Sequence, residues 1–402
     1  MPGKENIVMK LLHLPRTLLL LVIPALLLSA CGDRSELPER AFVMGVGIDE
    51  SENGKVLLTF QVYKPSQSVA AKGKVGNPYI NVKTTDDSVM EAVRDVTIHL
   101  GRKAQFSHMR VILISEKIAR KIQISKLLDM FYRDHEPRLT SSVIITKGSA
   151  SQFFDYHPFI ESTISQQYFL SEKSAARYSA KSEEINLLTL ALQLRSQTGI
   201  AVLPYLTTSP VETGKEPSVA GLAVLKNGLM VDKLTSYESE GLLMLTKTYH
   251  SGIIQLPCPS EGNEEASILK ESLEVVRLKS ERAIKLQDDR VTVNYRVHAS
   301  VAAIDLPCTT MNNSAEESAY EKRIAQEVKK QMKAAIAHLR KDKADLLDIG
   351  NDIYKYHPAK WRKWKPDWPE MFPEIEFHFD VEALMITHGT TAGKSLLETK
   401  SD

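Results

Sequence analysis

The spacing of apolar and polar residues predicts a hairpin at the start of the main body of the chain. Residues 41–48 and 55–63 are β-rich runs, and the turn-forming residues 49–54 separate them. Three further strands are predicted, at residues 79–84, 105–115 and 141–146. Apolar residues that recur every three or four positions predict two helices, at residues 88–100 and 116–132. Strand–helix–strand units that follow one another in this way indicate an α+β region.

Consecutive strand patterns dominate the second half of the chain. Asn227 and Gly228 lie between two apolar runs, and this dipeptide is a strong hairpin signal. Five more strands are predicted, the first four of them antiparallel, at residues 253–256, 268–278, 282–286, 291–302 and 374–385. Ser314 and Glu317 predict a capping box at the start of the longest helix, which we expect to end at Gly350. The apolar residues of this helix form one stripe, which predicts that it packs on a sheet.

These elements predict an α+β fold of several domains, in which mixed and antiparallel sheets pack against helices, including one long C-terminal helix. Residues 204–217 contain three prolines and a Thr/Ser cluster, a composition that predicts a linker. We therefore expect an N-terminal α+β region at residues 41–203, formed by one domain or by two subdomains. A C-terminal α+β domain is expected at residues 218–390, followed by a flexible tail at 391–402.

The N-terminal residues carry a pattern unlike the rest of the chain. Basic residues up to Arg16 precede about twelve apolar residues, and small residues lead to Cys31, which are the three parts of a secretory signal. Twelve helical residues span about 18 Å, less than the roughly 30 Å of a bilayer core, so a permanent membrane helix is not expected. The segment resembles a lipobox, which predicts a signal peptide at 1–30, a diacylglycerol on Cys31 and a lipid-proximal linker at 31–40. A plain secretory leader and a short anchor helix are the alternatives.

Composition adds two constraints. The hydrophobic share of 43% and the charged share of 25% are typical of a water-soluble globular body. The net charge of +1 provides no field that would attract nucleic acid, so we expect no nucleic-acid partner.

Beyond Cys31 the cysteines are Cys258 and Cys308, each in a Leu-Pro-Cys sequence. Outside the cytoplasm a disulfide between them is permitted, and two separate thiols are the alternative.

No motif in the sequence supports catalysis. Ser107 and His108 are neighbours on a predicted strand, where adjacent side chains point to opposite faces and cannot form a nucleophile–base pair. We therefore interpret His108 as a hydrogen-bonded histidine at a strand edge. Gly45 and Gly47 lack the third glycine of a dinucleotide site and indicate a closely packed strand instead. We expect no enzymatic activity, no catalytic residues, no metal and no cofactor.

Four polar residues cluster at the end of a predicted helix: Asp134, His135, Glu136 and Arg138. Neighbouring His and Glu residues on a turn rarely converge on one metal ion without further ligands. Two interpretations stay open for this cluster, a salt-bridged helix terminus and a patch that faces a partner.

A tryptophan-rich segment follows the long helix. Trp361 and Trp368 carry large apolar surfaces within a basic sequence. We expect them to pack over the end of the long helix, and anchoring at lipid headgroups is the alternative.

The order of these elements and several local signatures resemble one family, the C-subunit lipoproteins of spore germinant receptors, the Ger(x)C group. The resemblance runs from Cys31 to about Gly389, nearly the whole mature chain. It rests on five segments and the tryptophans that follow them: residues 41–49, 107–114, 133–138, 221–242 and 345–350.

The resemblance implies a receptor subunit of three α+β domains with no known catalytic activity, required for nutrient-triggered germination. It implies a lipid-anchored position on the outer face of the spore inner membrane, with protein contacts to a multi-spanning A subunit and a transporter-like B subunit. The family pattern assigns no ligand-contacting residues. An extracytoplasmic solute-binding lipoprotein that serves a transporter is the alternative, and its two doubly wound lobes would show regular βα alternation.

Overall fold

The computed structural model describes residues 40–64, 77–211, 214–258, 269–288 and 290–387. The chain divides into two units, 1–41 and 42–402, and nearly all described residues belong to the second. The predicted signal peptide at 1–30, Cys31 and the tail at 391–402 lie outside the described residues, as does almost all of the predicted linker at 31–40.

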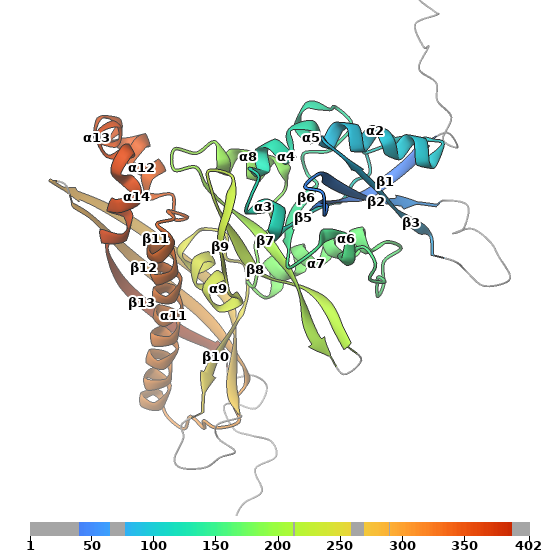
Figure 1. Cartoon of the computed structure of the whole chain (residues 1–402). Coiled ribbons are helices and arrows are strands. Elements are labelled where there is room, and N and C mark those ends of the chain that lie inside the picture. The colour runs from blue at the N-terminus through green and yellow to red at the C-terminus, as the bar shows by residue number, and fades with distance from the viewer. Residues whose placement is uncertain (1–39, 65–76, 212–213, 259–268, 289, 388–402) are drawn as a thin grey trace, which may run out of the picture. The chain divides into compact units, whose positions relative to one another are not determined.

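A nine-stranded mixed sheet forms the N-terminal part of the body (Figure 1). Its strands are β1 (Arg40–Glu50), β2 (Val56–Tyr63), β3 (Tyr79–Asp86), β4 (Lys103–Gln105), β5 (Val111–Ser115), β6 (Ser142–Thr146), β7 (Ile200–Val211), β8 (Gly214–Lys226) and β9 (Leu229–Leu234). The order is β3-β2-β1-β5-β6-β7-β8-β9, and β4 pairs with β1. The pairs from β1 through β5 and β6 to β7 are parallel, whereas the flanking pairs are antiparallel. All residues of β5 and β6 are buried, as expected for strands covered on both faces.

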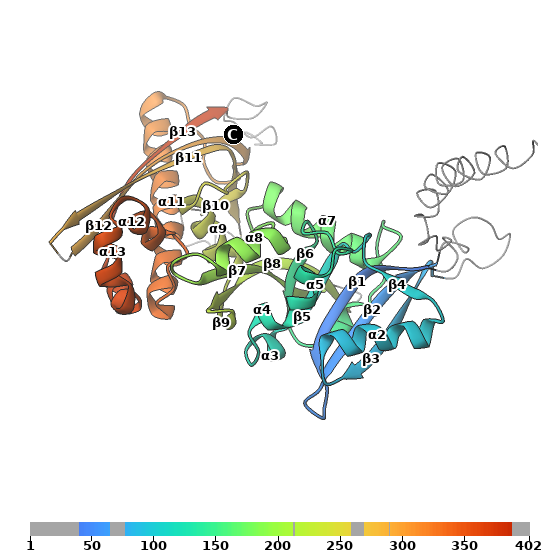
Figure 2. The ribbon, with the colours of Figure 1, turned by 90° about the horizontal axis from the view of Figure 1, so that it is seen from above.

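Seven helices of the described chain accompany this sheet. They are α2 (Val89–Leu100), α3 (Glu116–Ala119), α4 (Ile124–Leu127), α5 (Asp129–Arg133), α6 (Ala150–Phe153), α7 (Ile164–Tyr178) and α8 (Leu187–Leu194). Helix α2 packs on β2 and β3 (Figure 2), while α6 and α7 pack on β5. The helix predicted at 88–100 is confirmed: the Ser88 side chain caps its first turn, and Gly101 ends it with a left-handed φ of 61°.

The single helix predicted at residues 116–132 is wrong, because three short helices occupy this segment. Gln123 is not helical, with a ψ of 128°, and interrupts the predicted helix. The N–H of Ile124 donates to the carbonyl of Gly228 at 2.8 Å, so the turn of the β8–β9 hairpin holds this break. The periodicity along the chain gives no sign of this tertiary contact.

The close packing predicted at the two glycines of β1 is confirmed. A Cβ at Gly45 would lie 2.3 Å from Ser165 Oγ, and one at Gly47 would lie 2.9 Å from Phe154. The carboxylate of Asp49, also on β1, accepts the N–H groups of the first two residues of α6 at 2.8 Å each. The strand therefore packs against α6 and α7 at backbone distance.

The linker predicted at residues 204–217 is wrong in its local structure, because this segment forms most of the β7–β8 hairpin. Strand β7 pairs with β6 only at Tyr205 and Leu206, and β8 pairs with β9 only from Leu222 onward. After Leu206 in β7 and before Leu222 in β8, each strand therefore pairs on one side only among the described residues, and a proline is tolerated where its missing N–H faces the free side. Pro210 and Pro217 lie in this stretch, whereas Pro204 lies next to the pairing with β6.

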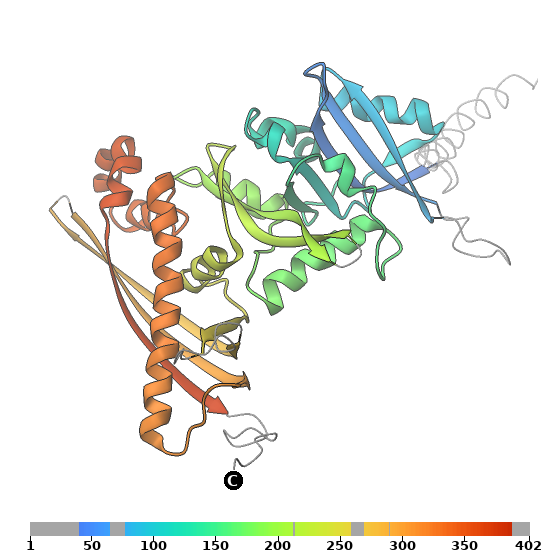
Figure 3. The same ribbon diagram turned by 60° about the horizontal axis from the view of Figure 1, so that its bottom comes forward.

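A four-stranded sheet forms the C-terminal part of the body, in the order β10-β11-β12-β13. Its strands lie beside the long orange helix in Figure 3. Its strands are β10 (Ile253–Pro257), β11 (Lys270–Gln287), β12 (Arg290–Asp305) and β13 (Glu376–Thr387). Strands β10 to β12 are antiparallel, and β13 pairs parallel to β12. The strands predicted at 268–278 and 282–286 are one strand, β11, because Lys279 and Arg282 continue the ladder with β12. Helix α11 (Ser314–Asp342) packs on β13, as the apolar stripe predicts.

Both predicted ends of the long helix require correction. Its N-cap is Asn313, one residue earlier than predicted, and the Asn313 side chain accepts two N–H groups of the first turn. The helix ends at Asp342, where Lys343 turns left-handed with a φ of 52°. Gly350 lies inside a later helix, where a Cβ would meet Trp361 at 2.7 Å, so close packing explains this glycine.

Short helices complete the C-terminal part: α9 (Ser236–Leu245), α12 (Ile349–Tyr356), α13 (Pro358–Trp364), η3 (Lys365–Asp367), α14 (Trp368–Met371) and η4 (Phe372–Glu374). The predicted burial of the tryptophans is confirmed, because the rings of Trp361 and Trp368 meet edge to face at 5.3 Å and both are buried. The indole N–H of Trp368 donates to Asp345, three residues beyond the end of α11. No helix in the described part of the chain is long and apolar enough to cross a membrane. The predicted α+β class, with mixed sheets and a long C-terminal helix, is confirmed.

Candidate functional site

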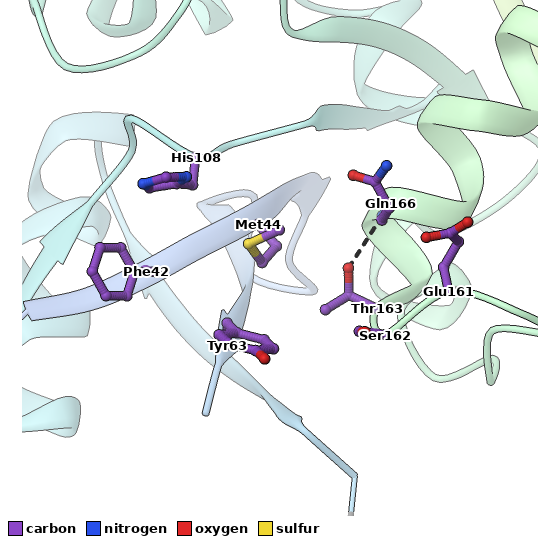
Figure 4. A pocket seen from close by; sticks show the side chains of 8 residues that line it. All are labelled: Phe42, Met44, Tyr63, His108, Glu161, Ser162, Thr163 and Gln166. Atoms are coloured by element: carbon purple, nitrogen blue, oxygen red, sulfur yellow. Dashed lines mark hydrogen bonds between the residues drawn. The ribbon is translucent and has the colours of Figure 1, made fainter. Parts of the chain in front are cut away.

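A largely apolar pocket of about 430 Å³ opens beside β1, the end of β2 and the start of α7 (Figure 4). Eight residues line it: Phe42, Met44, Tyr63, His108, Glu161, Ser162, Thr163 and Gln166. Its volume lies within the range of about 300–1,000 Å³ that is typical of ligand pockets.

Strand periodicity explains one wall of the pocket. Phe42 and Met44 are two positions apart on β1 and therefore point to the same face, whereas Val43 between them is fully buried on the other. The ring of His108 meets the ring of Phe42 edge-on, with centroids 5.3 Å apart (Figure 4). His108 lies in the loop between β4 and β5 and is exposed, so its prediction as a hydrogen-bonded strand-edge histidine is wrong.

The opposite wall is the segment that leads into α7. Thr163 is the N-cap of this helix, and its hydroxyl accepts the N–H of Gln166 at 3.2 Å, as the dashed line in Figure 4 marks. Thr163 is also buried, which fixes the wall in place. Phe159 and Ile160, just before this wall, are 66% and 89% exposed. Exposed apolar side chains next to an apolar pocket are typical of an interaction surface.

The residues that line the pocket suit the binding of an apolar group better than catalysis. Among the described residues, no hydrogen bond joins His108 to a hydroxyl group that lines the pocket. The Thr163 hydroxyl is occupied as a helix cap, so it is not placed as a nucleophile next to a base. Aromatic and methionine side chains instead suit an apolar group of a ligand or partner.

The four residues of the predicted cluster at the end of α5 do not form a single site. Asp134 accepts the N–H of Glu136 at 2.9 Å, and Glu136 accepts the N–H of Phe106 at 3.3 Å. These two carboxylates therefore accept backbone N–H groups and stabilise the chain at the end of α5, which fits the helix-terminus interpretation. The side chain of His135 is 95% exposed and lies 3.6 Å from Asp134.

Arg138 instead lies beside the main pocket. It lines a small neighbouring cavity of about 30 Å³ together with His108 and Arg110. The guanidinium of Arg110 lies 5.7 Å from the centroid of the Phe169 ring. The structure thus brings together residues from two of the segments that carry the family resemblance.

The two remaining sequence-predicted sites concern cysteines. Cys258 and Cys308 are joined by a disulfide, with their Cα atoms 5.6 Å apart. Cys31, the predicted lipidation site, lies outside the described residues.

Sequence reasoning missed several buried carboxyl groups. Burial raises the pKa of Glu172 to about 8, and it raises the pKa values of Glu183 and Glu240 to about 7. Glu172 follows Ile164 and Tyr168 at steps of four, so the helical period could have placed it on the buried face of α7.

Two sheets packed with helices, with an apolar pocket beside β1, define the class of the body as an α+β fold. The chain belongs to the spore germination protein family whose members include the C subunits of germinant receptors. Residues 33–208 match the family model "Spore germination protein N-terminal domain". Residues 220–389 match "Spore germination B3/ GerAC like, C-terminal". The family resemblance predicted from the sequence is therefore confirmed.

Known relatives cover nearly the whole chain. Spore germination protein B3 of Bacillus subtilis (strain 168) is 26% identical, with 91% of this chain and 96% of that protein covered. Spore germination protein KC of the same organism is 24% identical, with 90% and 93% covered. A crystal structure of the GerBC protein matches with a TM-score of 0.56 at 20% identity, covering 88% of this chain and all of that one. The last match concerns the fold alone.

Proposed function

We propose that this chain is the lipid-anchored C subunit of a nutrient germinant receptor at the outer face of the spore inner membrane. It acts in nutrient-triggered germination through contacts with the A and B membrane subunits and performs no catalysis. The observation that carries this proposal is the match of two family models, in order, to residues 33–208 and 220–389.

The predicted tether places the apolar pocket within reach of membrane partners. Phe42 follows Cys31 by eleven residues (42 − 31 = 11). An extended chain of that length spans at most about 40 Å. A diacylglycerol on Cys31 would therefore keep the pocket close to the membrane surface, where an A or B subunit could insert an apolar side chain.

The contact is tested by site-specific photo-cross-linking in intact spore membranes. A cross-linker at Met44, in the pocket, is expected to capture the A or B subunit. The matched control is Ile98 on α2, which is 78% exposed and is not among the residues that line the pocket. Capture from neither position, or equal capture from both, would contradict a contact between the apolar pocket and the A or B subunit.

The function is tested by replacing Met44. Met44→Asp introduces a charge into the apolar pocket and is expected to slow nutrient-triggered germination at least tenfold, while Ile98→Asp leaves it unchanged. Immunoblots of spore membranes check that both variants accumulate. Unchanged germination of spores that lack the gene, in a strain without a redundant receptor, would refute the proposed function itself.

The lipid anchor is tested at Cys31. Cys31→Ala is expected to release the chain from the membrane fraction and to abolish its function. Mass spectrometry of the mature wild-type chain is expected to find Cys31 at its N-terminus with an acylated thiol. An unmodified residue upstream of Cys31 at the N-terminus would contradict lipidation.

The alternative of a solute-binding lipoprotein has less support. It requires two doubly wound lobes, whereas the second sheet consists of consecutive antiparallel strands with one parallel edge strand. A thermal shift of the purified protein with amino acids or sugars would favour this alternative.

A further inference from the structure

A histidine and two aspartates converge between β9 and α11, far from the apolar pocket in the sequence. Asp232 lies on β9, and His338 and Asp342 lie four residues apart on α11, which places both on one helix face. One ligand atom from each residue lies within 4.8 Å of the other two. No motif marks this group, because its members come from distant parts of the chain.

A fourth residue fixes the orientation of the imidazole. Glu238 Oε1 lies 2.9 Å from His338 Nδ1. A carboxylate accepts hydrogen bonds, so the Nδ1 atom carries the hydrogen and Nε2 is directed at the aspartates. Glu238 is itself held by the capping box of α9, in which the N–H and hydroxyl of Thr235 donate to Glu238 Oε2 at 2.8 Å each. This arrangement matches the carboxylate–histidine pairs that orient metal ligands.

Two of the three converging atoms lack hydrogen-bond partners. His338 Nε2 and Asp342 Oδ2 are buried, and neither has a hydrogen-bond partner among the described residues. The Asp342 side chain is only 9% exposed. A buried acceptor without a donor costs folding free energy, and a cation bound to this oxygen would remove that cost. The third atom, Asp232 Oδ2, accepts a hydrogen bond from Lys341 Nζ at 2.9 Å, and the Lys341 side chain is 70% exposed.

The two distances from His338 Nε2 to the aspartates agree with a tetrahedral metal site. His338 Nε2 lies 3.3 Å from Asp342 Oδ2 and 3.5 Å from Asp232 Oδ2. Ligand atoms about 2.0–2.2 Å from a zinc ion at tetrahedral angles lie roughly 3.3–3.6 Å from one another. Asp342 is also the last residue of α11, where the helix dipole favours a positive charge.

We propose that Asp232, His338 and Asp342 bind a divalent transition-metal ion of the zinc class, with water as the remaining ligand. One imidazole nitrogen and two carboxylate oxygens suit Zn²⁺ better than Mg²⁺ or Ca²⁺, which prefer oxygen ligands alone. The ion joins β9 of the nine-stranded sheet to α11 and stabilises the packing between them. This site is independent of the proposed receptor function.

The test is zinc binding by the full-length chain, purified in detergent and stripped with a chelator. Isothermal titration with Zn²⁺ is expected to show one equivalent bound, and Zn²⁺ is expected to raise the melting temperature by several degrees, whereas Mg²⁺ has no effect. His338→Gln and Asp342→Asn are each expected to weaken zinc binding at least tenfold. The matched control is His378→Gln, since His378 is a histidine on β13 whose side chain is 55% exposed.

Asp232→Asn provides a second ligand variant if replacement of a more buried residue disturbs folding, because Asp232 is 31% exposed. Circular dichroism checks that each variant is folded. Failure of the wild-type protein to bind zinc would overturn the proposal. Zinc binding that is equally strong in the folded ligand variants would overturn it as well.

Discussion

The carboxylate of Asp345 accepts a hydrogen bond from the indole N–H of Trp368 at 3.1 Å. The same buried carboxylate accepts the N–H groups of Ile349 and Gly350 at 3.1 and 2.7 Å. Burial raises the pKa of Asp345 to about 6, while these three donors act against the rise. One side chain thus connects the end of α11, the start of α12 and the tryptophan pair.

Replacing Asp345 is therefore expected to destabilise the protein strongly. Asp345→Ala leaves three buried N–H groups without an acceptor, at about 1–3 kcal/mol each, so a loss of at least about 3 kcal/mol is expected. Urea unfolding at pH 7 measures it. Trp368→Phe is the matched control, because it removes one of the three donors, and it is expected to cost less. A change below about 0.5 kcal/mol in Asp345→Ala would contradict this role.

Glu172 is expected to make stability depend on pH. Its Oε1 atom accepts the N–H of Ile185 at 2.8 Å, and burial raises its pKa to about 8 from the ordinary value of 4.5. The folded state therefore holds a proton between these pH values that the unfolded chain releases. The stabilisation from this proton is complete below pH 4.5 and is lost as pH rises through about 8.

The variant Glu172→Gln isolates this effect, because its amide is neutral at every pH. Near pH 4.5 it is expected to match the wild type in stability, and at pH 9 to exceed it by roughly 2–4 kcal/mol. Urea unfolding across this pH range measures the difference. Glu184→Gln, at a side chain that is 46% exposed, is the control. A stability difference that does not change with pH would exclude Glu172 as the source.

Gly241 is expected to tolerate no side chain. It lies in α9 against α11, and a Cβ would lie 2.2 Å from the carbonyl oxygen of Gln331. Overpacking of this kind costs about 1–3 kcal/mol of unfolding free energy. We expect the loss for Gly241→Ala to lie at the upper end of this range, as measured by thermal or urea unfolding. Gly101→Ala is the control, since nothing lies within 4 Å of a Cβ there and only the left-handed backbone opposes it. Equal losses in the two variants would show that the helices separate easily.

The disulfide is expected to stabilise the second sheet. Cys258 and Cys308 are 50 residues apart, and a bridge closing such a loop is worth about 4 kcal/mol on the chain-entropy model. The double variant Cys258→Ser with Cys308→Ser should therefore unfold at a lower urea concentration. Reduced wild-type protein is the matched comparison. Two titratable thiols in the denatured, unreduced wild-type chain would contradict the bond.

Local sequence signals predicted the elements whose ends are set by neighbouring residues. Ser88 and Gly101 bound α2, and Asn227 with Gly228 forms the β8–β9 turn. Predictions failed where a distant partner decides the structure. The break between α3 and α4 depends on a carbonyl at Gly228, which lies more than a hundred residues further along the chain.

The candidate site could be predicted only in part for the same reason. His108 and the β1 residues stood out within the segments that carry the family resemblance. The opposite wall, around Thr163, is brought to them by tertiary packing. The proposed metal ligands are less predictable still, because His338 and its partner Glu238 are 100 residues apart.

The β7–β8 ladder pairs residues of one family region with residues of the other, as at Pro204 and Leu222. A protein cut between the two regions would leave each fragment with a row of unsatisfied backbone groups along its severed strand. Such open edges favour aggregation. The two regions are therefore expected to occur together in one chain, and neither is expected to fold well when it is expressed alone or fused to another protein.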